Sequence, residues 1–420
     1  RRARTKIRRY DGDSCIFDHY GLDRQLAEAF ARQVPLKSGG YLVIDETEAL
    51  IAVDVNTGRH KGKGSQEDAI LEVNLEAVEE VARQLRIRNI GGLVVLDLID
   101  MKSRKHQQQV YRALKNACRR DKADVRFNRF EQLLFETQPS QLHDKLVQRQ
   151  SDFATPLINC APDNQAYMQQ LQAFVADPFI QELHRLTDSC YSNLHWLESE
   201  LSEAMGRAAG LSSDVVPKRY FTMITGDLED YTNRVFCHDG DLVVSLDHYV
   251  LPYTKHLGYC NCPMYIVQLC NRQYIAADCM AAAARSRIAM PDGEPTLLDY
   301  IVMEGKVQYF LEQTMPSTPD TVRLRYSAAQ LGWMQHSVKD VWGYFLKNNL
   351  LYERDMARIH NFIDDAPKTN AFRNSAPRTT DYIGLQIVRA YMKHDHVTLD
   401  ELFANTNSQA ILQKSGFKPK

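Results

Sequence analysis

The sequence predicts an α/β region of about 120 residues, followed by a mainly helical (α+β) region. The first region shows the order strand, strand, helix, strand, helix. Two of its strands end in an aspartate, at Asp54 and Asp97. From residue 126 onward, long amphipathic stretches dominate and three short β-like runs interrupt them. These patterns indicate two regions with different architectures.

The α/β region begins with a predicted hairpin. Residues 41–45 and 49–53 are short β-rich runs, and a polar turn joins them. Residues 66–88 carry apolar side chains at helical spacing. Residues 89–97 form the next predicted strand, and residues 103–120 form a basic amphipathic helix. This order places both strand-end aspartates in one α/β layer.

The strand-end aspartates are candidate metal ligands. Asp54 and Asn56 follow one apolar run, and Asp97 and Asp100 follow another. Oxygen ligands from two strands can hold Mg²⁺ that keeps some of its waters. Such an ion activates water and neutralises charge on a phosphate undergoing displacement. The alternative is that both aspartates only cap the loops or helices that follow them.

Residues 58–64 form a loop rich in glycine and basic residues, which predicts contact with a nucleic-acid backbone. The basic side chains in the loop are Arg59, Lys61 and Lys63, and Arg88 ends the helix that follows. All four are candidates for binding RNA phosphates. The alternative is that the loop is solvated charge and that Arg88 only complements the helix dipole.

The segment from Arg8 to Asp124 resembles the ribonuclease E/G family. The matching stretches include Leu36-Lys-Ser-Gly-Gly40-Tyr-Leu-Val-Ile-Asp45, Val53-Asp-Val-Asn-Thr-Gly58, Asn74-Leu-Glu-Ala77, Ala82-Arg-Gln-Leu-Arg86 and Asp97-Leu-Ile-Asp-Met101. The resemblance implies a partial DNase I-like catalytic subdomain over residues 36–124. Residues 1–35 would be the tail of a preceding RNase H-like subdomain. After Asp124 the family's pattern stops, so the subdomain is expected to be incomplete.

This resemblance also implies roles for the candidate residues. Asp54 and Asp97 would bind Mg²⁺, and Asn56 would orient the scissile phosphate or the attacking water. Asp100, in the same turn as Asp97, would support the site. Enzymes of this family cut single-stranded RNA internally and leave a 5′-phosphate, so single-stranded RNA is the implied partner.

Charge and hydropathy set further expectations. Residues 1–125 carry 23 basic and 19 acidic side chains, whereas the remainder carries 28 and 34. This asymmetry agrees with an RNA-facing first region and a different role for the second. No apolar run approaches the ~20 residues of a membrane span, and no cleavable leader opens the chain. We therefore expect a cytoplasmic location.

The nine cysteines are not expected to form a disulfide framework, because their number is odd and no CxxC pair occurs. Cys260, Cys262, Cys270 and Cys279 form a cluster that could bind a metal. Its spacing fits no zinc pattern well, which favours buried or free thiols.

The second region is predicted to contain helices within residues 165–206 and β-like runs at 220–225, 234–237 and 242–247. Residues 125–420 resemble the gliding-motility-associated lipoprotein B group of Bacteroidota, which is normally associated with the cell envelope. The matching motifs include Leu246-Asp-His-Tyr249, Leu297-Leu-Asp-Tyr-Ile-Val-Met-Glu304-Gly-Lys306, Gly384-Leu-Gln-Ile-Val-Arg389 and Ser415-Gly-Phe-Lys-Pro419. The resemblance implies a degenerate zincin-like domain. A protein partner or a second copy of the chain is a further expectation for this helical region.

Peptidase activity is not expected from this region. In the related metallopeptidases a Glu-Gly pair supplies the third zinc ligand, and Glu304-Gly305 occupies such a place. The motif His-Glu-x-x-His, which puts two imidazoles on one zinc, occurs nowhere in the sequence. Glu304 is therefore predicted to be a structural ion-pair partner. His394 and His396, at alternate positions, are predicted to be solvated.

Two hypotheses of function follow. In the first, the chain is a magnesium-dependent endoribonuclease fused to a non-catalytic gliding-motility-like domain. In the second, it is a non-enzymatic, envelope-associated interaction protein whose ribonuclease-like part is a relic or an artefact of fusion.

Overall fold

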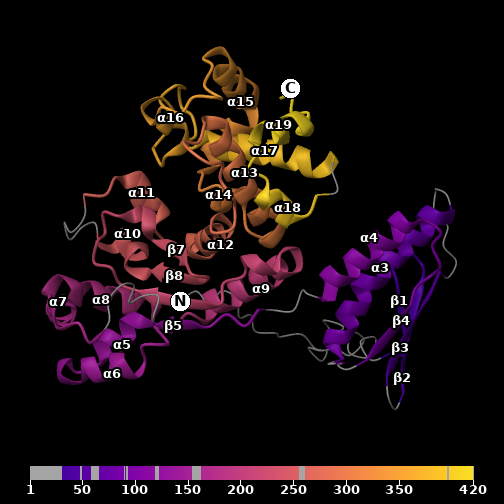
Figure 1. The fold of residues 1–420 in the computed structure, drawn as a ribbon, viewed down its shortest axis with the longest axis horizontal. Helices are drawn as coiled ribbons and strands as arrows, with labels where there is room; N and C mark the ends of the chain where they lie inside the picture. Colours follow the sequence, from indigo (N-terminus) through magenta and orange to yellow (C-terminus); the bar gives the residue numbers. More distant parts are fainter. Residues whose placement is uncertain are drawn as a thin grey trace, which may run out of the picture. The chain divides into compact units, whose positions relative to one another are not determined.

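The computed structural model shows a chain of two compact units, residues 1–120 and 121–420 (Figure 1). The structure describes residues 31–47, 50–57, 66–88, 90, 93–118, 123–153, 162–254, 261–394 and 397–419. The predicted basic side chains of residues 59, 61 and 63 lie outside this part of the chain.

Unit 1 contains a four-stranded sheet in the order β1-β2-β3-β4. Its strands are β1 (Gln33–Pro35), β2 (Tyr41–Glu46), β3 (Ile51–Asn56) and β4 (Val94–Asp97). The first three strands are antiparallel, and β4 runs parallel to β3. The predicted hairpin is confirmed, whereas β4 is shorter than expected and β1 was not predicted. Among the described strands, β4 has no neighbour on its outer side.

Two helices, α3 (Gln66–Ile87) and α4 (Arg104–Cys118), pack together beside this sheet (Figure 1). The side chains of Leu42, Val53 and Val55 are buried in one core with those of Val73 and Val81 of α3, since alternate strand residues point to the same face. The other residues of each strand, which include both predicted metal ligands, point to the opposite face. One face of the sheet therefore forms the core, and the other is open and carries the candidate metal ligands.

The turn between β1 and β2 requires glycine at two positions. Gly39 has φ +91°, a conformation that side chains with a Cβ rarely adopt. A Cβ on Gly40 would lie 2.6 Å from the carbonyl oxygen of Asn56, at the end of β3. The Ser-Gly-Gly sequence therefore lets this turn pack directly against the strand end that carries Asn56.

Unit 2 is built around a second four-stranded sheet, in the order β5-β6-β8-β7. Its strands are β5 (Phe127–Arg129), β6 (Arg219–Met223), β7 (Val235–His238) and β8 (Asp241–Ser245). The three predicted β-like runs are confirmed, and β5 is an addition. Every residue of β8 is buried, because Leu242 and Val244 belong to one hydrophobic core and Val243 to another. Burial on both faces is typical of strands in parallel sheets.

Helices make up most of unit 2 (Figure 1). They are α5 (Phe130–Glu136), α6 (Leu142–Gln148), α7 (Gln165–Ala176), α8 (Pro178–Tyr191), α9 (His195–Leu211), α10 (Leu251–Thr254), α11 (Met264–Leu269), α12 (Ile275–Arg285), α13 (Leu297–Thr314), α14 (Asp320–Arg323), α15 (Ala328–Lys347), α16 (Met356–Ile363), α17 (Thr379–His394), α18 (Leu399–Ala404) and α19 (Ser408–Ser415). Of the helices that the structure describes, none is both long enough and apolar enough to cross a membrane.

Helices α13 and α17 cross at two glycines. A Cβ on Gly384 would lie 1.9 Å from the carbonyl oxygen of Ile301, and a Cβ on Gly305 would lie 2.3 Å from the backbone of Gly384. The two helix backbones therefore approach more closely than any larger residue would permit. This contact explains why both motifs contain glycine inside a helix, where glycine otherwise lowers stability.

We predict that Gly384→Ala lowers the free energy of unfolding by more than about 1 kcal/mol, because the added methyl group forces the helices apart. Gly343→Ala is the matched control, since its Cβ meets nothing within 4 Å and alanine favours an exposed helix. Denaturant unfolding of the full chain measures both effects. Equal stability of the two variants would contradict the assigned role of the crossing.

Candidate active site

Asp54 and Asp97 lie side by side at the ends of two neighbouring strands. They are register partners across the parallel β3–β4 pair. Paired residues in adjacent strands point to the same face, and the strands lie about 4.8 Å apart. Both side chains are exposed. The two carboxylates that were predicted to act together therefore occupy one open face of the sheet.

Asn56 also belongs to this face and orients Asp54. Its side-chain Nδ2 donates a hydrogen bond of 2.8 Å to Oδ2 of Asp54. The bond leaves the other carboxylate oxygen of Asp54 and the amide oxygen of Asn56 available to a ligand. The proximity of these two residues agrees with the predicted site, while their chemical roles stay predictions.

A buried residue absent from the predicted site, Asn74, holds the segment after β4. Its Nδ2 donates to the carbonyl oxygen of Ile99 at 2.8 Å, and its Oδ1 accepts from the backbone N–H of Ile99 at 3.1 Å. These two bonds fix the loop that leads from Asp97 to the exposed Asp100. Asn74 is fully buried, so its side-chain amide needs internal hydrogen-bond partners, and Ile99 supplies both.

Glu76 fixes the turn that packs against Asn56. Its carboxylate accepts hydrogen bonds from the backbone N–H groups of Lys37, at 2.5 Å, and Ser38, at 2.8 Å. Burial alone would raise the pKa of Glu76, but the hydrogen bonds from Ser38 and Lys37 outweigh it and lower the pKa. The anionic form therefore holds the turn, and through Gly40 it supports the end of β3.

Arg88 has internal partners. Its Nε donates to Oε1 of Gln84 at 2.9 Å, and its Nη2 donates to the carbonyl oxygen of Ala31 at 2.6 Å. Burial lowers the pKa of its guanidinium. The structure thus gives Arg88 a tethering role in unit 1, and its contact with RNA stays a prediction.

The donors at the carboxylate site fit Mg²⁺. This ion takes hard oxygen ligands and is commonly held by one or two carboxylates, with waters and substrate phosphates completing the octahedron. Asp54 and Asp97 supply two such carboxylates on a face that water reaches. Within the described residues no group of three or more His, Cys, Asp or Glu side chains is arranged to hold a metal ion. Two carboxylates alone would leave most of the coordination sphere of such an ion to water and to substrate phosphates.

Glu304 in unit 2 forms an ion pair, as the sequence predicted. The Nε and Nη2 of Arg285 donate to its two carboxylate oxygens at 3.1 and 2.8 Å. Arg285 ends α12, and Glu304 lies on α13. The pair therefore links these two helices.

The cysteines differ in part from the expectation. Cys270 and Cys279 are free and buried, in agreement with it. Cys262, however, is disulfide-bonded, which the odd number of cysteines and the missing CxxC pair did not predict. The side chains of His394 and His396 lie outside the described part of the chain.

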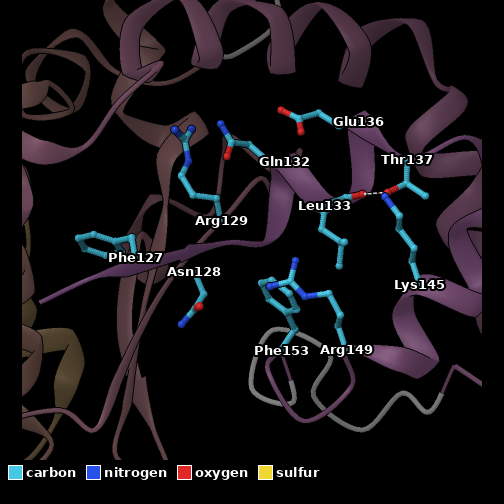
Figure 2. Close-up of a pocket in the computed structure, with 10 residues that line it drawn as sticks. All are labelled: Phe127, Asn128, Arg129, Gln132, Leu133, Glu136, Thr137, Lys145, Arg149 and Phe153. Carbon is cyan, nitrogen blue, oxygen red and sulfur yellow. Dashed lines mark hydrogen bonds between the residues drawn. The ribbon is translucent and has the colours of Figure 1, made fainter.

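A basic groove that was not predicted lies on β5, α5 and α6 of unit 2 (Figure 2). Three cationic side chains line it, Arg129, Lys145 and Arg149. The guanidinium of Arg149 lies over the ring of Phe153, and its Cζ is 4.7 Å from the ring centroid. Arg129 is engaged by the buried Glu131, at 2.6 Å. The groove can attract anions, although Glu136 also lines it.

We predict that Asn74→Ala lowers the free energy of unfolding by about 1–3 kcal/mol, because the N–H and C=O of Ile99 lose their buried partners. Hydrogen exchange at the amides of residues 98–100 should quicken. The control is Gln107→Ala, which removes an exposed bond of 2.6 Å to the carbonyl oxygen of Met101 that water can replace. Unchanged exchange in Asn74→Ala would refute the positioning role.

Comparison with known proteins finds two families on this chain. Residues 1–135 match the ribonuclease E/G family, and residues 112–419 match the family described as gliding motility protein GldB. Ribonuclease G of Salmonella typhimurium is 42% identical over 129 residues, which are 31% of this chain and 26% of that protein. Ribonuclease E of Haemophilus influenzae is 45% identical over 125 residues, which are 30% of this chain and 13% of that protein.

The chain thus spans about a quarter or less of the length of these ribonucleases. Its mixed α/β first unit is consistent with a domain of the ribonuclease E/G type, and its second unit is mainly helical. The second family match covers well over half of the sequence. The chain therefore belongs to the gliding motility protein GldB family and carries a ribonuclease E/G segment in its first 135 residues.

Proposed function

We propose that unit 1 carries a magnesium-dependent endoribonuclease site of the ribonuclease E/G type that cleaves single-stranded RNA. The observation that supports this proposal is the in-register pairing of Asp54 and Asp97 on an exposed sheet face. The match of residues 1–135 to the ribonuclease E/G family, and the similarity to ribonucleases G and E, also support it. The subdomain would be DNase I-like, as the family resemblance implies.

In this proposal Asp54 and Asp97 hold Mg²⁺. When bound, the ion supplies activation of water and neutralisation of phosphate charge. Asn56 fixes the orientation of Asp54 through their 2.8 Å hydrogen bond and keeps its amide oxygen free to position a water or a substrate hydroxyl. Asp100 follows on the loop that Asn74 anchors, where its carboxylate supports the site electrostatically.

RNA would be bound through phosphate contacts from Arg59, Lys61, Lys63 and Arg88. Cationic side chains that bind RNA release the counterions around its phosphates, so the affinity of the chain for RNA should fall steeply as the salt concentration rises. Arg88 can take part while it remains bonded to Gln84 and Ala31, because a guanidinium has five donors.

For unit 2 we propose a non-catalytic, degenerate zincin-like domain that binds a protein partner or a second copy of the chain. Two histidines one helical turn apart would be needed to hold zinc. On α12, the two residues that have this spacing and line the same cavity as Glu304 are alanines, Ala277 and Ala281. Both carboxylate oxygens of Glu304 already accept hydrogen bonds from Arg285. If unit 1 has no ribonuclease activity, the chain is instead an interaction protein of the gliding-motility type, which the extent of that family match favours.

We predict that Asp97→Asn abolishes magnesium-dependent cleavage of a fluorescent single-stranded RNA and weakens Mg²⁺ binding measured by calorimetry. The fold should persist, because Asp97 is exposed and no described residue is bonded to its carboxylate. Asp45→Asn is the matched control, since this carboxylate lies on the same sheet but pairs with Arg32. Cleavage that survives Asp97→Asn, or that proceeds in excess EDTA, would exclude the assigned site.

We also predict that the full chain does not cleave casein with added zinc, because the described residues around Glu304 supply no pair of imidazoles. Release of labelled peptides measures the activity, with a known zinc peptidase as positive control. Zinc-dependent proteolysis that a chelator stops would show that unit 2 is catalytic.

A further inference from the structure

The open face of the sheet in unit 1 carries apolar side chains as well as carboxylates. Tyr41 and Val43 of β2 point to it, since the alternate residues of this strand are buried in the core. Both are partly exposed, and neither belongs to the hydrophobic core of unit 1 or packs against it. Val95 of β4 lies on the same face as Asp97 and is exposed. Apolar surface therefore adjoins the candidate active site.

The strand register places Tyr41 beside that site. Val43 pairs with Asp54 across β2 and β3, and Asp54 pairs in turn with Asp97. In the next row of the sheet, Tyr41 pairs with Asn56. Directly opposed side chains of an antiparallel pair have Cβ atoms about 4.5–5.5 Å apart, and diagonal neighbours are about 7–8 Å apart. Tyr41 is thus next to Asn56 and one diagonal step from Asp54.

The ring of Tyr41 has no partner within the part of the chain that the structure describes. No described aromatic ring or cation contacts it, and no described residue is hydrogen bonded to its hydroxyl. On its other side Tyr41 pairs with Pro35 of β1, a small and exposed side chain. An aromatic ring in this setting is available to stack on a flat ligand.

The position of Tyr41 restricts that ligand. A substrate that brings a phosphate to Asp54 and Asp97 extends over this face of the sheet. The bases of single-stranded RNA are unstacked, and proteins bind them on aromatic rings while basic side chains hold the backbone. In a duplex each base lies inside the stack, so a ring on the protein surface cannot reach its face.

Electrostatics also favours a contact that involves no charge. Asp54 and Asp97 are exposed carboxylates, and they repel the phosphates of RNA until a cation binds between them. Stacking of a base on the ring of Tyr41 does not depend on that cation. It can therefore hold a nucleotide at this face before the metal ion screens the carboxylates.

We propose that Tyr41 is a base-stacking residue, whose ring binds one unpaired base of the RNA next to the phosphate that is cleaved. Tyr41 is then a positioning residue that selects single-stranded over double-stranded RNA. This inference rests on the ribonuclease function proposed above. It adds the residue that recognises the unpaired state of the substrate.

The test measures binding in EDTA, so it depends neither on cleavage nor on Mg²⁺. Fluorescence anisotropy of the full chain follows two ligands, an unstructured labelled RNA and a ribose-phosphate chain of the same length that lacks bases. Both carry the same charge, so the ratio of their affinities measures contacts to bases. The wild-type chain should prefer the RNA by about fivefold or more. This preference should persist as the salt concentration rises, because stacking releases no counterions.

Two variants of Tyr41 test the role of its ring. Tyr41→Leu should remove most of the preference for bases, since it keeps an apolar side chain on the strand but loses the ring. Tyr41→Phe should retain the preference, because stacking needs the ring and not the hydroxyl. Tyr111→Leu is the matched control, since Tyr111 is 66% exposed on α4 and not on the sheet. Circular dichroism and thermal unfolding check the fold of each variant.

Duplex RNA and kinetics give two further measurements. A blunt RNA duplex should bind equally to the wild-type chain and to Tyr41→Leu, so the variant should lose its discrimination between single and double strands. In cleavage assays Tyr41→Leu should raise KM and leave kcat nearly unchanged, because the stacked base is bound alike before and during the reaction. Damage to the fold would instead lower kcat as well.

The outcomes separate this inference from the proposed function. Loss of the preference for bases in Tyr41→Leu, whether or not the wild-type chain cleaves RNA, supports the stacking role. Cleavage that Asp97→Asn abolishes, together with an equal preference for bases in the wild-type chain and in Tyr41→Leu, would keep the catalytic site and overturn the role of Tyr41. Equal binding of both ligands by the wild-type chain would overturn it as well. Self-association that Tyr41→Leu abolishes would instead assign this face to a second copy of the chain.

Discussion

The parallel pairing of β3 with β4 is the contact on which the chemistry of unit 1 depends. It places Asp54 beside Asp97 on the same face, although 42 residues separate them in the sequence. Because side chains alternate along a strand, a slip of one residue in this register would turn one carboxylate toward the core. The buried side chains Val53 and Val55 oppose such a slip, since it would expose them.

The two units use charge in opposite ways. In unit 1 the carboxylates are exposed, so water screens them and a cation can approach without a large desolvation cost. In unit 2 the side chains of Arg234, Arg325 and Asp278 are largely buried, and Asp278 keeps its charge because these two guanidinium groups and Tyr249 surround it. Exposed carboxylates suit an exchangeable hydrated ion, whereas buried charges that pair with one another fix the elements that carry them.

Local patterns predicted much of the fold. The helical spacing of apolar residues predicted both ends of α3 to within one residue, and β-rich runs predicted β2, β3, β6, β7 and β8. Strands β1 and β5 were missed because each has only three residues, too few to show an alternation. The candidate carboxylates could be predicted because they follow apolar runs. The supporting role of Asn74 and the pairing of Asp278 with Arg234 and Arg325 could not, because they depend on contacts between residues far apart in the sequence.

The outer side of β4 has a consequence for the solution behaviour of unit 1. Leu93 just before this strand and Val95 within it are 63% and 48% exposed. No described strand pairs with the outer edge of β4. An open edge with apolar side chains is a template for adding a further strand, from the same polypeptide or from another. Where nothing else covers it, such an edge favours self-association, and Val95→Lys would oppose this by placing a charge beside it.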